Sequence, residues 1–174
     1  MQTELALPVY LPPPKRRVPT PPREFKVLTL GECPSPDVPI LDDSGKAVAY
    51  CRRAIEGSPL FNKDVESLVV ICLNTRKRAI GHTFACTGTL DTVMLTPRDV
   101  FKPAFAMNAA AILLVHNHPS GDPTPSAGDI KVTRDVIRAG QLLKIEVVDH
   151  IILGAPGYGK GYTSLKEQGH FAAF

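Results

Sequence analysis

The chain has 174 residues, of which 44% are hydrophobic, and a formal net charge of +3. This length and composition fit a single globular domain, and so small a charge gives no argument for nucleic-acid binding. No apolar stretch is long enough to cross a bilayer, and the first residues lack the basic start and apolar core of a signal peptide. The four cysteines form no C-x-x-C pair. We therefore expect a reduced, cytoplasmic protein without a membrane partner.

Residues 1–44 are predicted to be a proline-rich, weakly basic arm that precedes a domain at 45–174. Ten of the seventeen prolines fall within residues 1–39, and a basic triplet follows three consecutive prolines. This composition is typical of an extended segment that buries little apolar surface. We interpret the arm as a flexible or surface-bound leader in preference to a docking tail for a partner, with 24–30 as a candidate strand.

From residue 45 onward, the pattern of apolar residues predicts helices and strands in a mixed order. The expected elements are a helix over 46–55, strands over 68–73 and 79–86, a helix that begins at Thr96-Pro97, a strand over 109–118, a helix over 129–139 ended by Gly140, and a strand over 145–153. The basic residues Arg76-Lys77-Arg78 are expected at the turn between two antiparallel strands, and Pro103 should bend its helix. Together these elements predict a three-layer α/β domain, a mixed β-sheet flanked by helices.

The most informative feature is a pair of histidines at the end of one predicted strand. An apolar run over 109–115 leads directly into His116-Asn117-His118. Because side chains alternate along a strand, both histidines point to one side and Asn117 to the other. Pro119 should end the pairing, so we expect the histidines at the edge of the sheet where α/β proteins bind ligands.

A serine and an aspartate follow at the start of the next helix. Counted from His118, seven residues precede Ser126, and two more precede Asp129. Ser126 is expected as the N-cap and Asp129 at the third helical position. Each feature alone is commonly structural, since Ser-x-x-Asp is a cap variant. Their combination in one strand–loop–helix unit predicts that His116, His118 and Asp129 bind a zinc ion with one coordination position open, as in catalytic zinc sites.

The remaining histidines have no partner at ligand spacing. His150 is interpreted as structural or as a support for the ligands, while His82 and His170 are not assigned to the site. Zinc nucleobase deaminases combine H-x-E with a later P-C-x-x-C. That second pattern is absent from this sequence, which excludes the deaminase class.

The segment HNHPSGDPTPSAGD, at 116–129, resembles the JAMM motif of JAB/MPN-domain zinc metalloproteases, specifically their bacterial RadC branch. Residues 96–105, 147–153 and 162–169 are similar to that family's helix before the zinc strand, its following strand and its closing segment. The resemblance covers about residues 45–170. It implies a JAB/MPN-like fold with a cytidine-deaminase-like architecture, and a zinc-dependent peptidase or isopeptidase that acts on a peptide or protein conjugate.

Such a hydrolase needs a carboxylate that takes a proton from the attacking water. Spacing alone does not choose among Glu56, Asp64, Glu66 and Glu146. The family's general base precedes its first core strand, as Glu66 does here, so the resemblance implies this role for Glu66, with Asp64 as the alternative. Ser126 is expected to stabilise the oxyanion together with the metal or only to cap its helix, and one hydroxyl is able to do both.

Two other functions are weighed against the enzyme. The RadC name carries a link to DNA repair, but the helix-hairpin-helix segment of many relatives has no counterpart in this sequence, and there is no basic stripe. A non-catalytic interaction module would usually lack metal ligands, and this chain lacks none. We therefore expect an active zinc metallopeptidase whose substrate and oligomeric state the sequence does not reveal.

Overall fold

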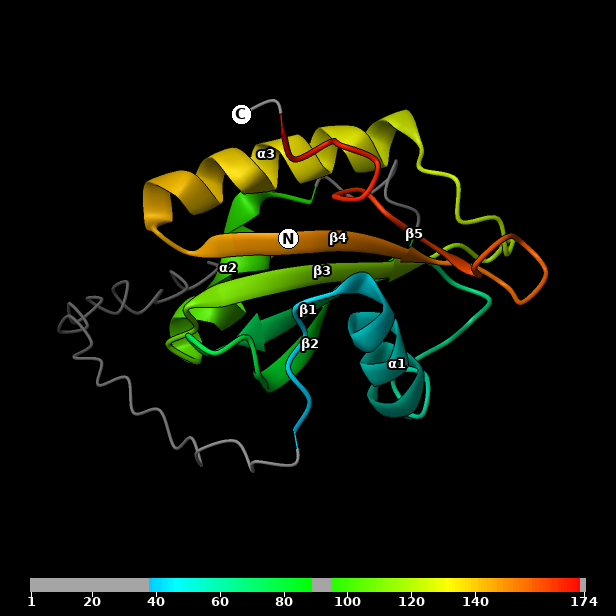
Figure 1. Ribbon diagram of the computed structural model, residues 1–174, viewed down its shortest axis with the longest axis horizontal. Helices are drawn as coiled ribbons and strands as arrows, with labels where there is room; N and C mark the ends of the chain where they lie inside the picture. Colours follow the sequence, from blue (N-terminus) through cyan, green and yellow to red (C-terminus); the bar gives the residue numbers. More distant parts are fainter. Residues whose placement is uncertain (1–37, 89–94, 173–174) are drawn as a thin grey trace, which may run out of the picture.

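The fold is known from a computed structural model that describes residues 38–88 and 95–172 (Figure 1). The helices are α1 (Ser44–Ala54), α2 (Pro97–Ala106) and α3 (Ala127–Leu143), and the strands are β1 (Ser67–Leu73), β2 (Ala79–Thr87), β3 (Ala111–Asn117), β4 (Glu146–Leu153) and β5 (Tyr162–Ser164). The five strands form a sheet in the order β2-β1-β3-β4-β5. Only β3 and β4 pair in parallel within it. The sheet is therefore mixed, as predicted.

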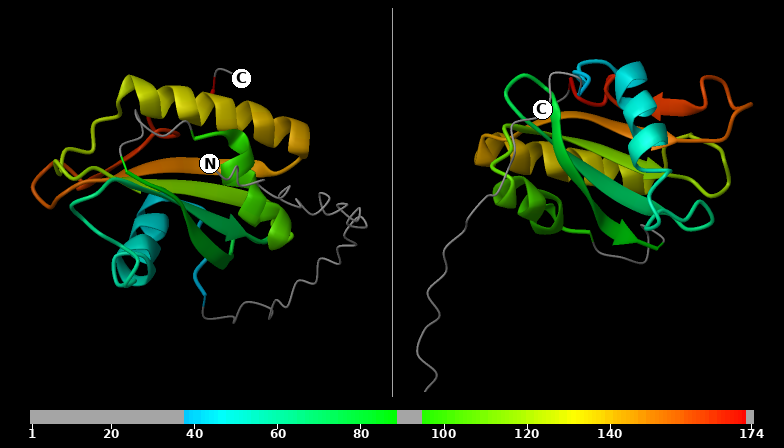
Figure 2. Two further views of the ribbon diagram at one scale, coloured as in Figure 1. Left: turned by 180° about the vertical axis from the view of Figure 1, so that it is seen from behind. Right: turned by 90° about the horizontal axis from the view of Figure 1, so that it is seen from below.

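Helices cover both faces of the sheet, which confirms the predicted three-layer α/β architecture. Helix α1 lies on one face, and α2 and α3 lie on the other, as the views from behind and from below show (Figure 2). The core is divided accordingly. Cys51 of α1 and Ile55 at its C-cap pack with one set of strand residues, and Phe101 of α2 and Val136 of α3 pack with the other. Each helix thus buries one apolar stripe against the sheet.

The two central strands are buried on both faces. All seven residues of β1 and all seven of β3 are buried. On β3, Leu113 and Val115 face α1, while Ile112 and Leu114 face α2 and α3. His116 has the same parity as Leu114, so the strand directs it toward the face that carries α3. This register determines which side of the sheet receives the predicted site.

Helix α3 is longer than the sequence analysis predicted, and Gly140 does not end it. The helix runs to Leu143, and Lys144 forms its C-cap in the left-handed region, with φ of 57°. Gly140 is buried, and a Cβ there would lie 2.6 Å from the carbonyl oxygen of Ile145. The glycine is needed because the chain entering β4 passes close to the last turns of the helix.

The domain includes residues that precede the predicted boundary at 45. Leu41 is fully buried in the core, and Asp43 caps α1 by accepting a hydrogen bond from the Lys46 amide at 2.8 Å. Residues 1–37, including the candidate strand at 24–30, lie outside the described part of the chain. The extended character of the arm therefore stays a prediction.

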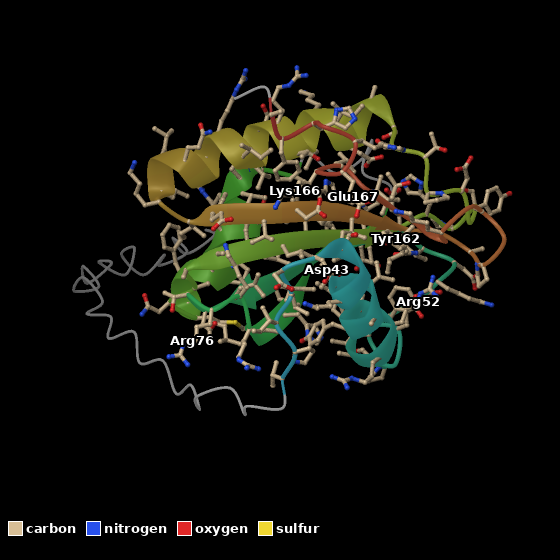
Figure 3. The ribbon with its side chains drawn as sticks, viewed as in Figure 1. Asp43, Arg52, Arg76, Tyr162, Lys166 and Glu167 are labelled. Carbon is tan, nitrogen blue, oxygen red and sulfur yellow. The ribbon has the colours of Figure 1, made fainter. Side chains whose placement is uncertain are left out.

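The closing segment packs against the beginning of α1. Tyr162, Lys166 and Glu167 gather around the first turn of that helix (Figure 3). Ser44 donates a hydrogen bond to Glu167 and lies 3.3 Å from the Tyr162 hydroxyl. The chain after β4 thereby returns to the N-terminal side of the domain, which closes the layer formed by α1.

Two further expectations concern Pro103 and the cysteines. Pro103 lies inside α2, which ends three residues later at Ala106, so its missing amide affects only the last turn. Cys51 and Cys72 are free and buried, and burial raises the pKa of their thiols to about 12 and about 11. Across residues 38–88 and 95–172, no helix combines the length and apolar character that crossing a membrane requires.

Candidate metal centre

Four side chains converge at the end of β3 where α3 begins. Glu66, His116, His118 and Asp129 each offer one ligand atom, and these atoms all lie within 4.8 Å of one another. The structure thus brings together the three predicted ligands and the predicted general base. The histidines come from the end of β3 and the residue after it, Asp129 comes from the first turn of α3, and Glu66 comes from the residue before β1.

His116 is the most deeply buried member of the group. Its side chain has no exposed surface, and its Nδ1 lies 2.8 Å from Nε2 of His150. Its Nε2 lies 3.0 Å from Nε2 of His118 and 3.2 Å from Oδ1 of Asp129. One ring nitrogen is therefore engaged by the protein interior, and the other points into the cluster.

His118 is oriented by the loop that follows it. Its Nδ1 lies 2.7 Å from the backbone oxygen of Asp122. A carbonyl oxygen only accepts, so this nitrogen carries the proton and leaves Nε2 unprotonated in the neutral ring. The loop bends at Gly121, where φ is +80° and a Cβ would lie 2.9 Å from that of Ala155. This glycine permits the tight turn that brings the Asp122 carbonyl back to His118.

Asp129 is held by the capping box at the start of α3. The Ser126 hydroxyl donates to Oδ2 of Asp129 at 2.7 Å, the Ser126 amide donates to the same oxygen at 2.7 Å, and the Asp129 amide donates to the hydroxyl at 3.1 Å. The predicted cap is confirmed. Burial by itself raises the pKa of Asp129, but the adjoining His116 and His118 imidazoles and the Ser126 hydroxyl lower it by more. The carboxylate therefore stays ionised at neutral pH, as a metal ligand requires.

The donor set fits a zinc ion. Oδ1 of Asp129 is buried and receives no hydrogen bond. It shares the cluster with the Nε2 atoms of His116 and His118, at 3.2 Å from the first. A buried carboxylate oxygen without a partner is costly in a protein interior, and a cation among these three atoms would satisfy it. Two imidazole nitrogens and one carboxylate oxygen are a ligand set that zinc takes in catalytic sites.

Glu66 is the only one of the four proposed base candidates that joins the cluster. Its Oε1 lies 3.8 Å from Nε2 of His116, and its side chain is 17% exposed. Glu56 and Asp64 line a neighbouring cavity but are not among the clustered residues, and Glu146 forms an ion pair with Lys77. The position of Glu66 therefore agrees with the role of general base that the resemblance implies for it.

Asn117 holds the segment that carries Glu66, a contribution that the sequence analysis did not identify. Its side-chain oxygen accepts a hydrogen bond from the Ser67 amide at 3.0 Å, and its side-chain nitrogen donates to the Val65 carbonyl at 3.0 Å. These two bonds bracket Glu66 on both sides. The alternation of β3 predicted only that Asn117 points away from the histidines. Its bonds to residues 65 and 67 follow from the pairing of β3 with β1.

A cavity of about 690 Å³ lies beside the cluster. His118 and Asn117 line it together with the segment around Phe61, the end of β4 at Leu153 and the loop after β4, including Pro156. The cavity joins apolar and polar lining groups next to the least buried ligand. The cavity therefore gives access to the cluster from the side of His118.

The remaining histidines differ sharply in their surroundings. His150 is fully buried beside His116, and burial lowers its pKa well below the ordinary value, so its ring is neutral. This place agrees with the interpretation of His150 as a support for the ligands. His82 lies on β2, with Nδ1 3.2 Å from the Tyr50 hydroxyl, and neither His82 nor His170 belongs to the cluster.

Comparison with known families decides the identity of the domain. The model of the RadC-like JAB domain matches residues 41–170. The chain belongs to this RadC family of JAB domains. The predicted resemblance is thereby confirmed, and the match begins at the buried Leu41.

Curated RadC-family relatives include UPF0758 proteins of several bacteria. The protein of Thermotoga maritima is 40% identical over 129 residues, which are 74% of this chain and 54% of the relative. UPF0758 protein YsxA of Bacillus subtilis is 45% identical over 124 residues, which are 68% of this chain and 52% of the relative. The chain thus spans about half the length of these relatives, and their names state no activity.

Proposed function

We propose that this RadC-family domain is a zinc-dependent hydrolase that cleaves an amide bond in a peptide or protein conjugate. The observation that carries the proposal is the convergence of His116, His118 and Asp129 with Glu66 beside a cavity of about 690 Å³. Three ligands and an adjacent carboxylate at an accessible cavity are the features that distinguish a catalytic zinc site from a structural one.

His116, His118 and Asp129 would hold the metal through two ring nitrogens and one carboxylate oxygen. A bound zinc ion at this position supplies a water of lowered pKa and an electrophilic contact for the substrate carbonyl. The amide and the hydroxyl of Ser126 both donate to Oδ2 of Asp129, which favours the ionised carboxylate. The burial of His116 and Asp129 excludes bulk water from the inner side of the cluster, which strengthens electrostatic interactions there.

Glu66 is the group that moves protons in this proposal. Its carboxylate accepts a proton from the attacking water and returns it to the nitrogen of the leaving amine. The partial exposure of Glu66 on the open side of the cluster leaves room for both partners. Asn117 fixes the position of this carboxylate through the backbone on either side of it.

Ser126 has one role that its contacts explain and one that stays a prediction. Its hydroxyl donates to Asp129 Oδ2 and accepts from the Asp129 amide, so it caps α3 and orients a ligand. Donation to a developing oxyanion requires the hydroxyl to exchange Asp129 Oδ2 for the substrate oxygen. We keep this second role in the proposal because Ser126 lies directly beside the cluster.

Metal content is the first test. Purified protein is expected to carry about one zinc per chain, measured by elemental mass spectrometry, and the double variant His116→Ala, His118→Ala is expected to carry none. Equal zinc in both proteins would refute the site.

The second test is cleavage of a peptide library, analysed by mass spectrometry. Cleavage should require zinc and disappear in Glu66→Gln, and zinc-loaded protein that leaves every peptide and conjugate intact would argue for a non-catalytic module.

A further inference from the structure

A chain of three buried hydrogen bonds connects His116 with Asp129, two of the proposed ligands, behind the candidate metal centre. His116 Nδ1 lies 2.8 Å from His150 Nε2, and His150 Nδ1 lies 2.6 Å from the Thr133 hydroxyl. The same hydroxyl lies 2.6 Å from the backbone oxygen of Asp129, one turn earlier on α3. All four residues are buried. This hydrogen-bond chain therefore joins β3, β4 and α3 through contacts that water does not reach.

The donor and the acceptor of each bond in this hydrogen-bond chain can be assigned. Two oxygen atoms 2.6 Å apart repel each other unless a proton lies between them, and a carbonyl oxygen has none to give. The Thr133 hydroxyl therefore donates to Asp129, a common arrangement for threonine within a helix. Because its single proton is used there, Thr133 accepts from His150, and His150 must carry a proton on Nδ1.

The same reasoning continues to the ligand. The two side chains that contact the His150 imidazole, those of His116 and Thr133, carry no negative charge, and the imidazole is fully buried, so it is neutral. A neutral ring protonated on Nδ1 accepts at Nε2. His116 must then donate from its own Nδ1, and its Nε2 keeps an unshared electron pair that points into the cluster.

We infer that Thr133 and His150 are positioning residues for the metal centre, because the Thr133 hydroxyl fixes the tautomer of His150, which fixes His116 with Nε2 free to bind a cation. This inference rests on the proposed function for the identity of the cation as zinc. It differs from the support of His118, whose tautomer a loop carbonyl sets directly. If every donor and acceptor in the hydrogen-bond chain were exchanged, His116 would carry its proton on Nε2, where the cation must bind.

The test uses variants of Thr133, which lies outside the cluster itself. Thr133→Val keeps the shape of the side chain but removes the hydroxyl, so His150 loses its acceptor and is free to adopt the other tautomer. Zinc affinity, measured by competition with a chromophoric chelator, should fall about tenfold or more, as for other residues that orient metal ligands. Thr133→Ser retains the hydroxyl and should bind zinc almost as tightly as the wild type.

A second buried change on the same helix controls for loosened packing. Val136→Ala creates a cavity in the core beneath α3, away from the hydrogen-bond chain, and should destabilise the domain without weakening zinc binding. Equal zinc affinity in wild type and Thr133→Val would overturn the inference. An equal loss of affinity in Thr133→Val and Val136→Ala would also overturn it, because the effect would then be one of general stability.

A spectroscopic measurement of the His150 tautomer decides which atoms donate in the hydrogen-bond chain, without any activity measurement. In the protein as purified, long-range ¹H–¹⁵N correlations should show His150 protonated at Nδ1 and unprotonated at Nε2. The opposite pattern would refute the inference. If the wild type bound no zinc, the proposed function would fail. The His150 tautomer would still decide whether the donors and acceptors of the hydrogen-bond chain are those inferred.

Discussion

The metal centre has a buried half and an open half, and the two halves are built differently. His116 and Asp129 belong to β3 and α3, are almost completely buried, and are fixed by contacts deep in the fold. His118 and Glu66 lie just outside regular elements and remain partly exposed. A loop carbonyl orients His118, and the Asn117 side chain holds the backbone on either side of Glu66. The buried half is suited to hold a cation, while the open half is suited to meet a substrate at the adjoining cavity.

This contrast shows how one short motif combines rigidity with access. A strand buried on both faces places His116 among apolar layers, and the next side chain of the same parity emerges at the edge of the sheet. Catalytic groups need support within about half an ångström, while substrates need an entrance. The end of a central strand provides both conditions within three residues.

The largest expected effect separates the two histidines. Both His116→Ala and His118→Ala should abolish zinc binding, because each removes one of three ligands. His116→Ala should also lower the free energy of unfolding by about 3 kcal/mol, since it creates a buried cavity and leaves His150 Nε2 without a donor. His118→Ala should cost less than about 1 kcal/mol. Urea titrations in excess chelator measure this difference, and equal destabilisation would remove the distinction between the halves.

A change in the open half should affect turnover without affecting metal or fold. Glu66→Gln should retain zinc and stability but lose about a hundredfold or more in kcat, because an amide does not accept the proton of the water. Asp64→Asn is the matched control, since Asp64 lies on the same segment and lines the cavity without joining the cluster. A large loss in Asp64→Asn with normal turnover in Glu66→Gln would transfer the role to Asp64.

The clamp formed by Asn117 should link stability to turnover. Asn117→Ala leaves the buried Ser67 amide and the Val65 carbonyl without their partner, which should cost about 2 kcal/mol. Because Glu66 then loses its fixed position, kcat should fall about tenfold while zinc content is unchanged. Asn62→Ala removes only a local bond to the Asp64 amide and should leave kcat near the wild-type value. Loss of zinc in Asn117→Ala would contradict the assignment.

The smallest expected effect on stability concerns Ser126. Ser126→Ala should lower stability by about 1 kcal/mol, whereas Ser126→Gly should cost only a few tenths, because glycine is an acceptable N-cap. If the hydroxyl also donates to an oxyanion, both variants should lose about a hundredfold in kcat with zinc fully loaded. Near-normal kcat in Ser126→Gly would leave the serine as a cap and a support for Asp129 alone.

The elements that could be predicted are those whose signals are local. The apolar run before His116 predicted a strand buried on both faces, and its period of two placed both histidines on one side. Thr96-Pro97 and Ser126 marked the starts of α2 and α3 correctly because caps depend on a few neighbouring residues. For the same reason, the three predicted ligands came from one segment of fourteen residues, and the structure brings their ligand atoms together.

The features that could not be predicted depend on contacts between distant segments. Glu66 precedes His116 by fifty positions, and the pairing of Leu68 with His116 brings them together. Spacing could not have chosen it, and only the family resemblance did. Gly140 was wrongly taken as the end of α3, because its requirement comes from the Ile145 carbonyl and not from its own helix. The contacts of Asn117 likewise arise only when β1 and β3 lie side by side.

The complete burial of β1 and β3 has a consequence for how the domain opens. Amide hydrogens of central, doubly covered strands exchange with solvent only through the rarest and largest openings. The backbone amide of His116 should therefore be among the slowest to exchange, while amides in the segment around Glu66 should exchange through small local fluctuations. Isotope exchange would then map a gradient across a centre only a few ångströms wide, in which the partly exposed half opens many times for each opening of the buried half.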